Sequence, residues 1–206
     1  VAKDANKLVE EFMLLANRRV AEFCSSKVVG GRKTPRTMIY RVHDEPNDEK
    51  LTRFREFVLR FGYRFSASKG RAVAKGINKL MAEVKGRPEA NAISTLAVRS
   101  MSKAFYTTDN IGHYGLAFKY YTHFTSPIRR YPDMMVHRLL AHYLAGGKSS
   151  DKRALEAQCV YASEREVVAS DAERASIKYK MVEFMKDKIG EMYKGHVSGM
   201  SEWGIY

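Results

Sequence analysis

The sequence predicts a helix-rich α+β fold, and three observations support this prediction. Apolar residues recur at three- and four-residue intervals through most of the chain, which is the period of one face of an α-helix. The chain has 206 residues, 45% of them hydrophobic, which suffices for one well-buried core with or without a small appendage. Beyond Gly190 the helical period gives way to alternation around glycines, which favours short strands.

The expected elements follow in order along the chain. An apolar period predicts a helix over residues 3–25, and a basic loop (26–36) and a short strand (37–42) come next. Asn47 or Asp48 can cap a helix that reaches Phe61, and helices over 73–84 and 89–103 are separated by Gly86–Pro88. An irregular aromatic-rich stretch (105–131) precedes a helix that starts at Pro132 and ends at Gly146. One or two helices over residues 151–189 bring the total to six or seven.

The charge balance favours polyanionic partners. Lys and Arg total 36 against 23 Asp and Glu, so the formal charge is +13, which makes nucleic acid the first expectation and an anionic membrane surface the second. No stretch approaches the roughly 18 consecutive apolar residues of a membrane span, and no signal segment opens the chain, so we expect a cytoplasmic protein without a membrane partner. The two cysteines, Cys24 and Cys159, exclude a disulfide framework and a structural zinc site.

The segment 119–140 carries the strongest functional signal. The hydroxyls of Thr125 and Ser126 and the guanidinium groups of Arg129 and Arg130 come directly before the helix that starts at Pro132. Hydroxyls, guanidinium forks and free helix N–H groups together favour binding of a phosphate. The neighbouring aromatics could stack on bases; they are Tyr120, Tyr121, Phe124 and Tyr131.

The residues alone also allow a purely structural interpretation of this segment. Aromatic-rich stretches more often belong to a core than to a binding surface. One arginine could pair with Asp133, and the hydroxyls could cap the helix. Composition by itself leaves both interpretations open.

A resemblance to a known family favours the functional interpretation. Residues 123–133 read HFTSPIRRYPD and closely resemble the HFTSPIRRYxD signature of the ribonuclease II and ribonuclease R family, the processive 3′-to-5′ exoribonucleases with an RNB catalytic domain. VEEFMLLAN (9–17), IYRVHDEP (39–46) and the run at 95–121 resemble the family in the same order, and the run around Trp203 resembles the first strands of an OB-fold. The resemblance implies the C-terminal part of an RNB domain over residues 1–189 and the beginning of a truncated OB-fold RNA-binding domain over 190–206.

The implied activity is hydrolysis of single-stranded RNA from its 3′ end to nucleoside 5′-monophosphates, with Mg²⁺ activating water and holding the phosphate. Members of the family bind these ions through aspartates in the N-terminal half of the RNB domain, and no such cluster occurs in this sequence. The densest acidic group, residues 44–49, is typical of a helix N-terminus. We therefore expect a fragment without the N-terminal, metal-binding half, inactive alone, whose uncovered apolar face promotes self-association.

The resemblance also assigns roles to individual residues. Arg129 matches the arginine that stabilises charge on the cleaved phosphate, and Arg130 either shares this role or forms a structural pair. Glu10 matches a glutamate near the 3′-terminal nucleotides, where it could accept a ribose 2′-OH, although an exposed surface role is the alternative. Glu173 matches a position lining the active-site region, against the alternative of a helix-surface pair. The other residues expected near RNA are His123, Thr125, Ser126 and Tyr131.

Two rival functions remain at this point. The first is a non-catalytic RNA-binding protein that retains the RNB scaffold. The second is a helical interaction module whose basic face binds an acidic protein. Phosphate contacts predict an affinity that falls with the logarithm of salt concentration, with a slope of about −0.7 per neutralised phosphate on single strands.

Overall fold

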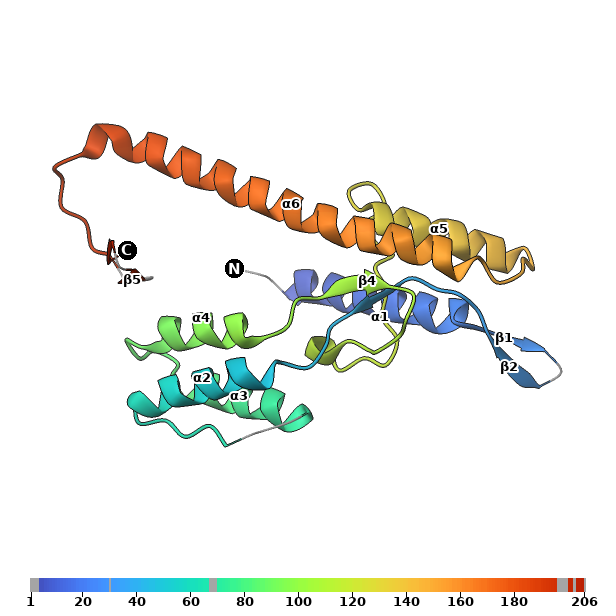
Figure 1. The fold of residues 1–206 in the computed structure, drawn as a ribbon, viewed down its shortest axis with the longest axis horizontal. Helices are drawn as coiled ribbons and strands as arrows, with labels where there is room; N and C mark the ends of the chain where they lie inside the picture. The colour runs from blue at the N-terminus through green and yellow to red at the C-terminus, as the bar shows by residue number, and fades with distance from the viewer. Residues whose placement is uncertain (1–3, 30, 67–69, 196–199, 202, 206) are drawn as a thin grey trace.

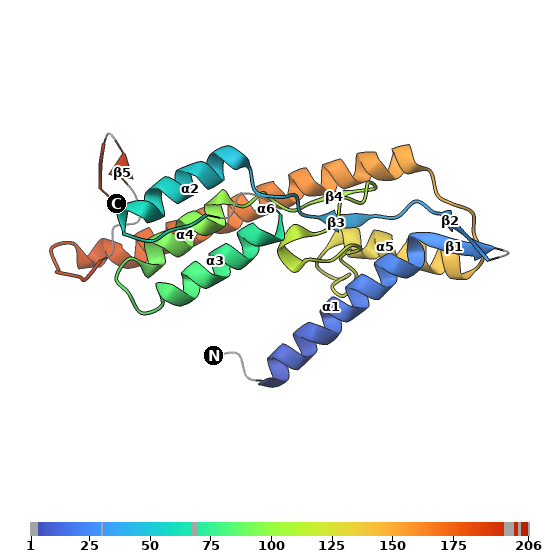
Figure 2. The same cartoon turned by 90° about the horizontal axis from the view of Figure 1, so that it is seen from below.

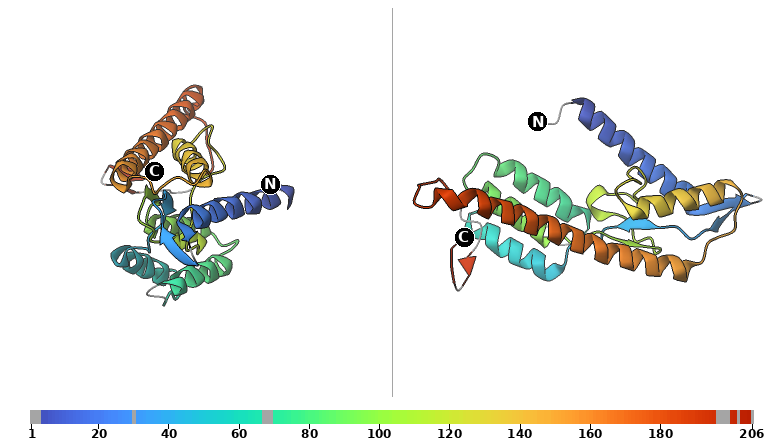
Figure 3. Two further views of the ribbon diagram at one scale, coloured as in Figure 1. Left: turned by 90° about the vertical axis from the view of Figure 1, so that its right-hand side faces the viewer. Right: turned by 90° about the horizontal axis from the view of Figure 1, so that it is seen from above.

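The computed structural model describes residues 4–29, 31–66, 70–195, 200–201 and 203–205. Two paired strands, β3 (Tyr40–Val42) and β4 (Phe105–Thr107), separate two groups of helices (Figure 1). Helices α5 and α6 lie on one side of these strands and α2, α3 and α4 on the other, as the end-on view in Figure 3 also shows. The helices are α1 (Asp4–Cys24), α2 (Asp48–Arg60), α3 (Arg71–Glu83), α4 (Ala90–Ser100), α5 (Tyr131–Leu144) and α6 (Lys152–Met185), with 3₁₀ turns η1 (Tyr114–Leu116) and η2 (Lys186–Lys188). The strands are β1 (Ser26–Val29), β2 (Arg32–Pro35), β3 (Tyr40–Val42), β4 (Phe105–Thr107), β5 (Met200–Ser201) and β6 (Gly204–Ile205). The prediction of a helix-rich α+β fold is confirmed.

The expected basic loop is in fact a β-hairpin. Strands β1 and β2 pair antiparallel, with Val28 opposite Lys33 and Val29 opposite Arg32. Gly31 has a φ of +78°, a conformation that glycine adopts without steric cost, and so it permits a tight connection. The prediction of a loop was wrong because basic and polar residues dominate this stretch, so its strands lack the apolar alternation of a half-buried sheet.

The buried residues form two separate cores. The first core lies among β3, β4, α5 and the start of α6, and its fully buried members include Met38, Ile39 and Val136. The second lies among α2, α3 and α4, around Phe54, whose ring meets that of Phe65 edge-on at 5.4 Å. As expected, Asn47 caps α2: its side-chain oxygen accepts the Glu49 and Lys50 backbone N–H groups at 2.9 and 3.3 Å.

The apolar stripe of α1 is largely uncovered, although the bounds of the helix lie within one residue of those predicted. Leu8, Val9 and Phe12 are 59%, 57% and 62% exposed, whereas Ala21 and Cys24 are fully buried. Figure 2 shows the reason, because the N-terminal half of α1 projects away from the other helices.

Residues 152–185 form one continuous helix, α6, and not two. Only its first third packs on β4 and α5, and Cys159 is its buried side chain. No described helix is long and apolar enough to cross a bilayer. At the C-terminal end, β5 and β6 pair antiparallel. The OB-fold expected over 190–206 and the domain division stay predictions, and its residues 196–199, 202 and 206 lie outside the described residues.

Candidate functional site

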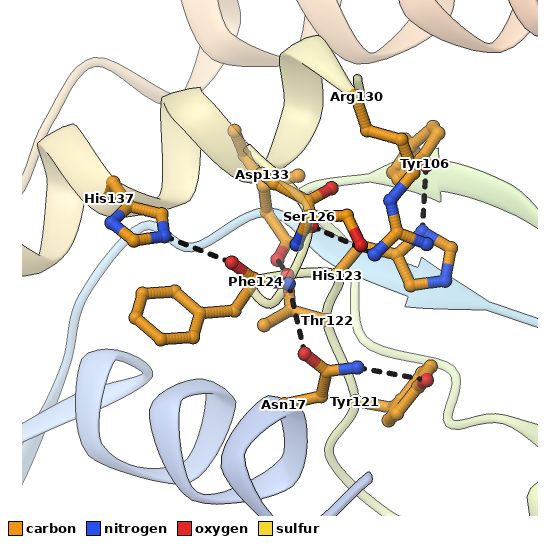
Figure 4. Close-up of polar contacts among 11 residues, drawn as sticks. Asn17, Tyr106, Tyr121, Thr122, His123, Phe124, Ser126, Arg130, Asp133 and His137 are labelled. Atoms are coloured by element: carbon orange, nitrogen blue, oxygen red, sulfur yellow. Dashed lines mark hydrogen bonds and ion pairs between the residues drawn. The ribbon is translucent and has the colours of Figure 1, made fainter. Parts of the chain in front are cut away.

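The loop over residues 122–130 runs between α1 and α5 and is held by polar contacts from both helices (Figure 4). On the α1 side, the Asn17 side chain is only 4% exposed. Its Oδ1 accepts the backbone N–H of Phe124 at 3.0 Å, and its Nδ2 donates to the hydroxyl of Tyr121 at 3.2 Å. This buried amide therefore has the hydrogen-bond partners that a buried polar group needs, and it links α1 to the loop.

On the α5 side, the anchor is Asp133, which is completely buried. Its Oδ1 accepts the backbone N–H of Ser126 at 2.7 Å and the Nη2 of Arg130 at 2.8 Å. The Arg130 side chain is 20% exposed, so this ion pair is largely shielded from water. Of the alternatives open for Arg130, the structure shows the structural pair.

Two further contacts fix the backbone of the loop. Thr122 is fully buried and its hydroxyl donates to the carbonyl of Ile39 at 2.8 Å. The Nε2 of His137 on α5 donates to the carbonyl of Phe124 at 2.9 Å, and the rings of the two residues stack with centroids 4.0 Å apart. The loop is thus preorganised by contacts from β3, α1 and α5.

His123 lies on the β4 side of the loop. Its Nδ1 is 2.8 Å from the hydroxyl of Tyr106, whose ring is covered by the guanidinium of Arg41 at 4.6 Å. Arg41 in turn makes two hydrogen bonds of 2.6 and 3.0 Å to Glu166 of α6. Burial, with the nearby charges of Arg130 and Arg41, lowers the pKa of His123 to about 3, so its ring is neutral at pH 7.

A cleft of about 490 Å³ separates the N-terminal half of α1 from this loop. Four of the residues predicted for the site meet in its lining: Glu10, Thr125, Arg129 and Arg130. Arg129 is exposed and makes no ion pair within the described part of the chain. A free guanidinium and a carboxylate facing one cleft can bind a phosphate and a ribose hydroxyl, respectively.

The other predicted residues lie elsewhere. Ser126 contributes a backbone N–H to the Asp133 anchor, and neither Ser126 nor His123 lines the cleft. Tyr131 is 59% exposed at the start of α5, and Glu173 is exposed on α6 beyond the cleft. The structural interpretation holds for Tyr121, which is buried, and for Phe124, which packs against the first core; Tyr120 also packs against that core but is only partly buried.

Sequence reasoning missed Asn17 and Tyr106 as supports of the loop. A signal for Asn17 was present, because this amide sits four residues before Ala21 on the buried face of α1. A polar residue on an apolar helix face needs a partner. No comparable local signal marks Tyr106, whose hydrogen bond to His123 joins residues 17 apart.

The residues of this site do not fit a magnesium ion. The described residues contain no group of three or more His, Cys, Asp or Glu side chains placed to hold a metal ion. Glu10 is the carboxylate in the cleft lining, and Mg²⁺ sites draw on carboxylates and water in octahedral geometry. A magnesium ion at this cleft would therefore need ligands beyond those that the described residues supply.

Lowering the pH from 7.5 to 5 is expected to destabilise the chain through two histidines. Burial, reinforced by His43 and Arg41, lowers the pKa of His113 to about 4, and that of His123 is about 3. Their ordinary value is 6.5, so below that pH the unfolded chain binds protons that the folded chain does not. Below about pH 6.5 the free energy of unfolding should fall by up to about 1.4 kcal/mol per pH unit for His123, and by less for His113, which is more exposed to solvent. Urea titrations at several pH values, on the unaltered chain and on His123→Gln, check this. If the free energy of unfolding falls equally steeply with pH in both proteins, the prediction is contradicted.

Comparisons with known proteins bear on the family and the fold of this chain. The sequence matches the RNB domain family over residues 2–146. Ribonuclease R 1 of Lactococcus lactis is 37% identical, over 98% of this chain and 24% of its own length. The structure of Mycoplasma genitalium RNase R in complex with ribose methylated single-stranded RNA is 27% identical and superposes with a TM-score of 0.82, covering 100% of this chain and 32% of that one. Yeast Ssd1, a pseudonuclease, is 29% identical with a TM-score of 0.62, covering 76% of this chain and 19% of that one. The chain spans about a quarter of the length of the ribonuclease R relatives it matches.

Proposed function

This chain belongs to the RNB domain family, and we propose that it is part of a longer 3′-to-5′ exoribonuclease that hydrolyses single-stranded RNA to nucleoside 5′-monophosphates. One observation carries the proposal. Glu10 of α1 and Arg129 of the signature loop are far apart in the sequence but line the same cleft. Their side chains suit the roles that the family resemblance assigns to them: the carboxylate of Glu10 can accept a hydrogen bond from a ribose hydroxyl, and the guanidinium of Arg129 can bind a phosphate.

The proposed roles follow from the contacts of each residue. The guanidinium of Arg129 binds the scissile phosphate and stabilises the charge that develops on it. Arg130 holds the loop through Asp133, and Thr125 contributes polar lining beside them. Glu10 accepts the 2′-OH of a 3′-terminal ribose, which favours RNA over DNA. Mg²⁺ and its aspartate ligands belong to another part of the longer protein.

The proposal also includes the parts of the longer protein that adjoin this chain, and its place in the cell. The exposed apolar residues Leu8, Val9 and Phe12 of α1 suit packing against the N-terminal half of an RNB domain, and without that half the chain self-associates. An OB-fold begins after Gly190, and the protein acts in the cytoplasm. The chain alone, without metal ligands, does not cut RNA.

A second candidate is an RNA-binding protein that retains the RNB scaffold without catalysis. The likeness to yeast Ssd1, which is described as a pseudonuclease, favours it. The cleft and its arginine would then serve binding alone.

Degradation of a 5′-labelled single-stranded RNA separates the two candidates. We expect the longer protein to produce, in Mg²⁺, a ladder that shortens from the 3′ end, and chelation by EDTA to stop it. The chain alone should bind the RNA and leave its length unchanged. A longer protein that binds the RNA in Mg²⁺ but never shortens it would establish the second candidate.

A further inference from the structure

The β1–β2 hairpin is a strongly basic projection that the proposed function leaves unused. It extends from the C-terminal end of α1, at the opposite end of the molecule from the distal end of α6 (Figures 1 and 2). The side chains of Lys27, Arg32 and Lys33 are exposed on it, and residues 26–36 contain no Asp or Glu. A projection of this charge attracts anions.

Arg36 fixes the base of the hairpin against the helical body. Its backbone N–H donates to the carbonyl of Ser25 at 2.8 Å. Its Nη2 donates to the carbonyls of Phe23 and Ser26 at 2.8 and 3.1 Å. Its guanidinium lies over the ring of Tyr143 of α5, 4.2 Å from the ring centroid. The hairpin is therefore held in a set orientation, which lowers the entropic cost of binding a ligand there.

Between the hairpin and the body lies a polar cleft of about 910 Å³. Three separate segments contribute four cations to its lining: Lys33 and Arg36 from the hairpin and its base, Lys119 from the loop before the signature, and Lys152 from the start of α6. The hydroxyls of Thr37 and Ser149 and the ring of Tyr120 line it as well. Cations, hydroxyl groups and an aromatic ring are the features that bind single-stranded nucleic acid.

The carboxylates near this cleft leave most of its positive charge uncompensated. Glu22 faces it but is paired with Arg18 and Arg19 at 3.4 and 2.9 Å. Of the cations, Lys152 pairs with Asp109 at 2.6 Å. Lys33 and Lys119 are exposed and have no carboxylate partner among the residues that the structure describes. The cleft therefore suits an anionic ligand.

The two clefts are separate but adjacent. The first cleft lies between α1 and the loop over residues 122–130, and the hairpin cleft lies between the hairpin and the body. They share no lining residue, but Lys119 and Tyr120 line the hairpin cleft and the next residue, Tyr121, lines the first cleft. One short segment, residues 119–121, therefore borders both clefts, and a ligand long enough to pass this segment can contact both. Cations spread over three segments also match a linear polyanion better than a single compact ion.

We propose that the hairpin cleft is a second binding site for the phosphate backbone of single-stranded RNA. It holds a stretch of the strand several nucleotides before the 3′ end that lies in the first cleft. The identity of the polyanion rests on the proposed function, whereas the position and charge of the cleft are independent of it. Simultaneous occupation of both clefts raises the affinity for long RNA without changing that for short RNA.

Fluorescence anisotropy of 5′-labelled RNAs in EDTA tests the proposal, with strands of about 4 and about 20 nucleotides, spanning the usual site sizes. We expect Lys33→Glu/Lys119→Glu to weaken binding of the long RNA at least about tenfold and to make the salt slope shallower by about 1.4, for two lost phosphate contacts. The affinity of this double variant for the short RNA should stay within about threefold of that of the unaltered chain. Arg129→Ala, in contrast, should weaken binding of both RNAs. Lys178→Glu/Lys186→Glu, on the distal part of α6, makes the same charge change and is expected to affect neither.

The outcomes separate the second site from the proposed function. Equal affinities of the two double variants for long RNA would overturn the second site while leaving the first cleft intact. An equal loss on short and long RNA would also overturn it, because the lysines would then act through the first cleft or the overall field. Failure of the unaltered chain to bind either RNA would contradict the proposed function together with this site. Binding of polyglutamate as tight as that of long RNA, lost in the same variant, would identify an acidic-protein site instead.

Discussion

Replacing Arg129 with alanine in the longer protein is expected to slow hydrolysis of the 3′-terminal phosphodiester by about 10²- to 10³-fold, the usual cost of removing one preorganised donor. The structure gives the reason for choosing this arginine. Arg129 lines the cleft without an ion pair among the described residues, whereas its neighbour Arg130 is committed to Asp133. The guanidinium of Arg129 is therefore available to a phosphate. Single-turnover rates on 5′-labelled RNA measure the effect without interference from product release.

Two variants serve as controls for this prediction. Arg129→Lys keeps the charge but loses the planar two-point geometry, so its rate should lie between those of the unaltered protein and the alanine variant. Arg138→Ala removes an exposed arginine two turns further along α5 and should leave the rate unchanged. If Arg129→Ala weakens RNA binding but retains the single-turnover rate at saturation, Arg129 is a binding residue and not a catalytic one.

Replacing Asp133 with alanine is expected to lower the free energy of unfolding by about 3–5 kcal/mol, the cost of breaking a buried ion pair from one side. The change strands the Arg130 guanidinium and leaves the backbone N–H of Ser126 without its acceptor. Both consequences fall on the signature loop, so RNA binding in the first cleft should weaken as well. Urea unfolding at pH 7 gives the midpoint and slope that report the change.

A surface pair provides the matched control. Asp171 of α6 is paired with Arg174 in an exposed ion pair, and Asp171→Ala should cost no more than about 1 kcal/mol. The double variant Asp133→Ala/Arg130→Ala should recover part of the loss, since it removes the unpaired buried charge. A loss below about 1 kcal/mol for Asp133→Ala would mean that the loop is held mainly by Asn17 and His137.

Much of the fold could be predicted because its signals are local. The apolar period located all six α-helices of the described residues, Asn47 was one of the two expected caps of α2, and Pro132 lies in the first turn of α5. The β1–β2 hairpin was missed because its strands are short, basic and exposed, so no burial imposes an alternating pattern on them. The uncovered stripe of α1 shows the converse: the period predicted a helix, but burial depends on what packs against it.

The sequence by itself determined the helical framework, the basic charge and the signature loop with its two adjacent arginines and its hydroxyls. Only the tertiary structure decided which arginine is available to a ligand: both line the cleft, but Arg130 is paired with the buried Asp133. It also decided that Tyr121 is buried and that Asn17 holds the loop. The physical reason is that a buried partner has to be supplied by packing: Asp133 is buried only in the folded chain, and Asn17 finds its partners Tyr121 and Phe124 about a hundred residues away, so a local pattern does not identify them.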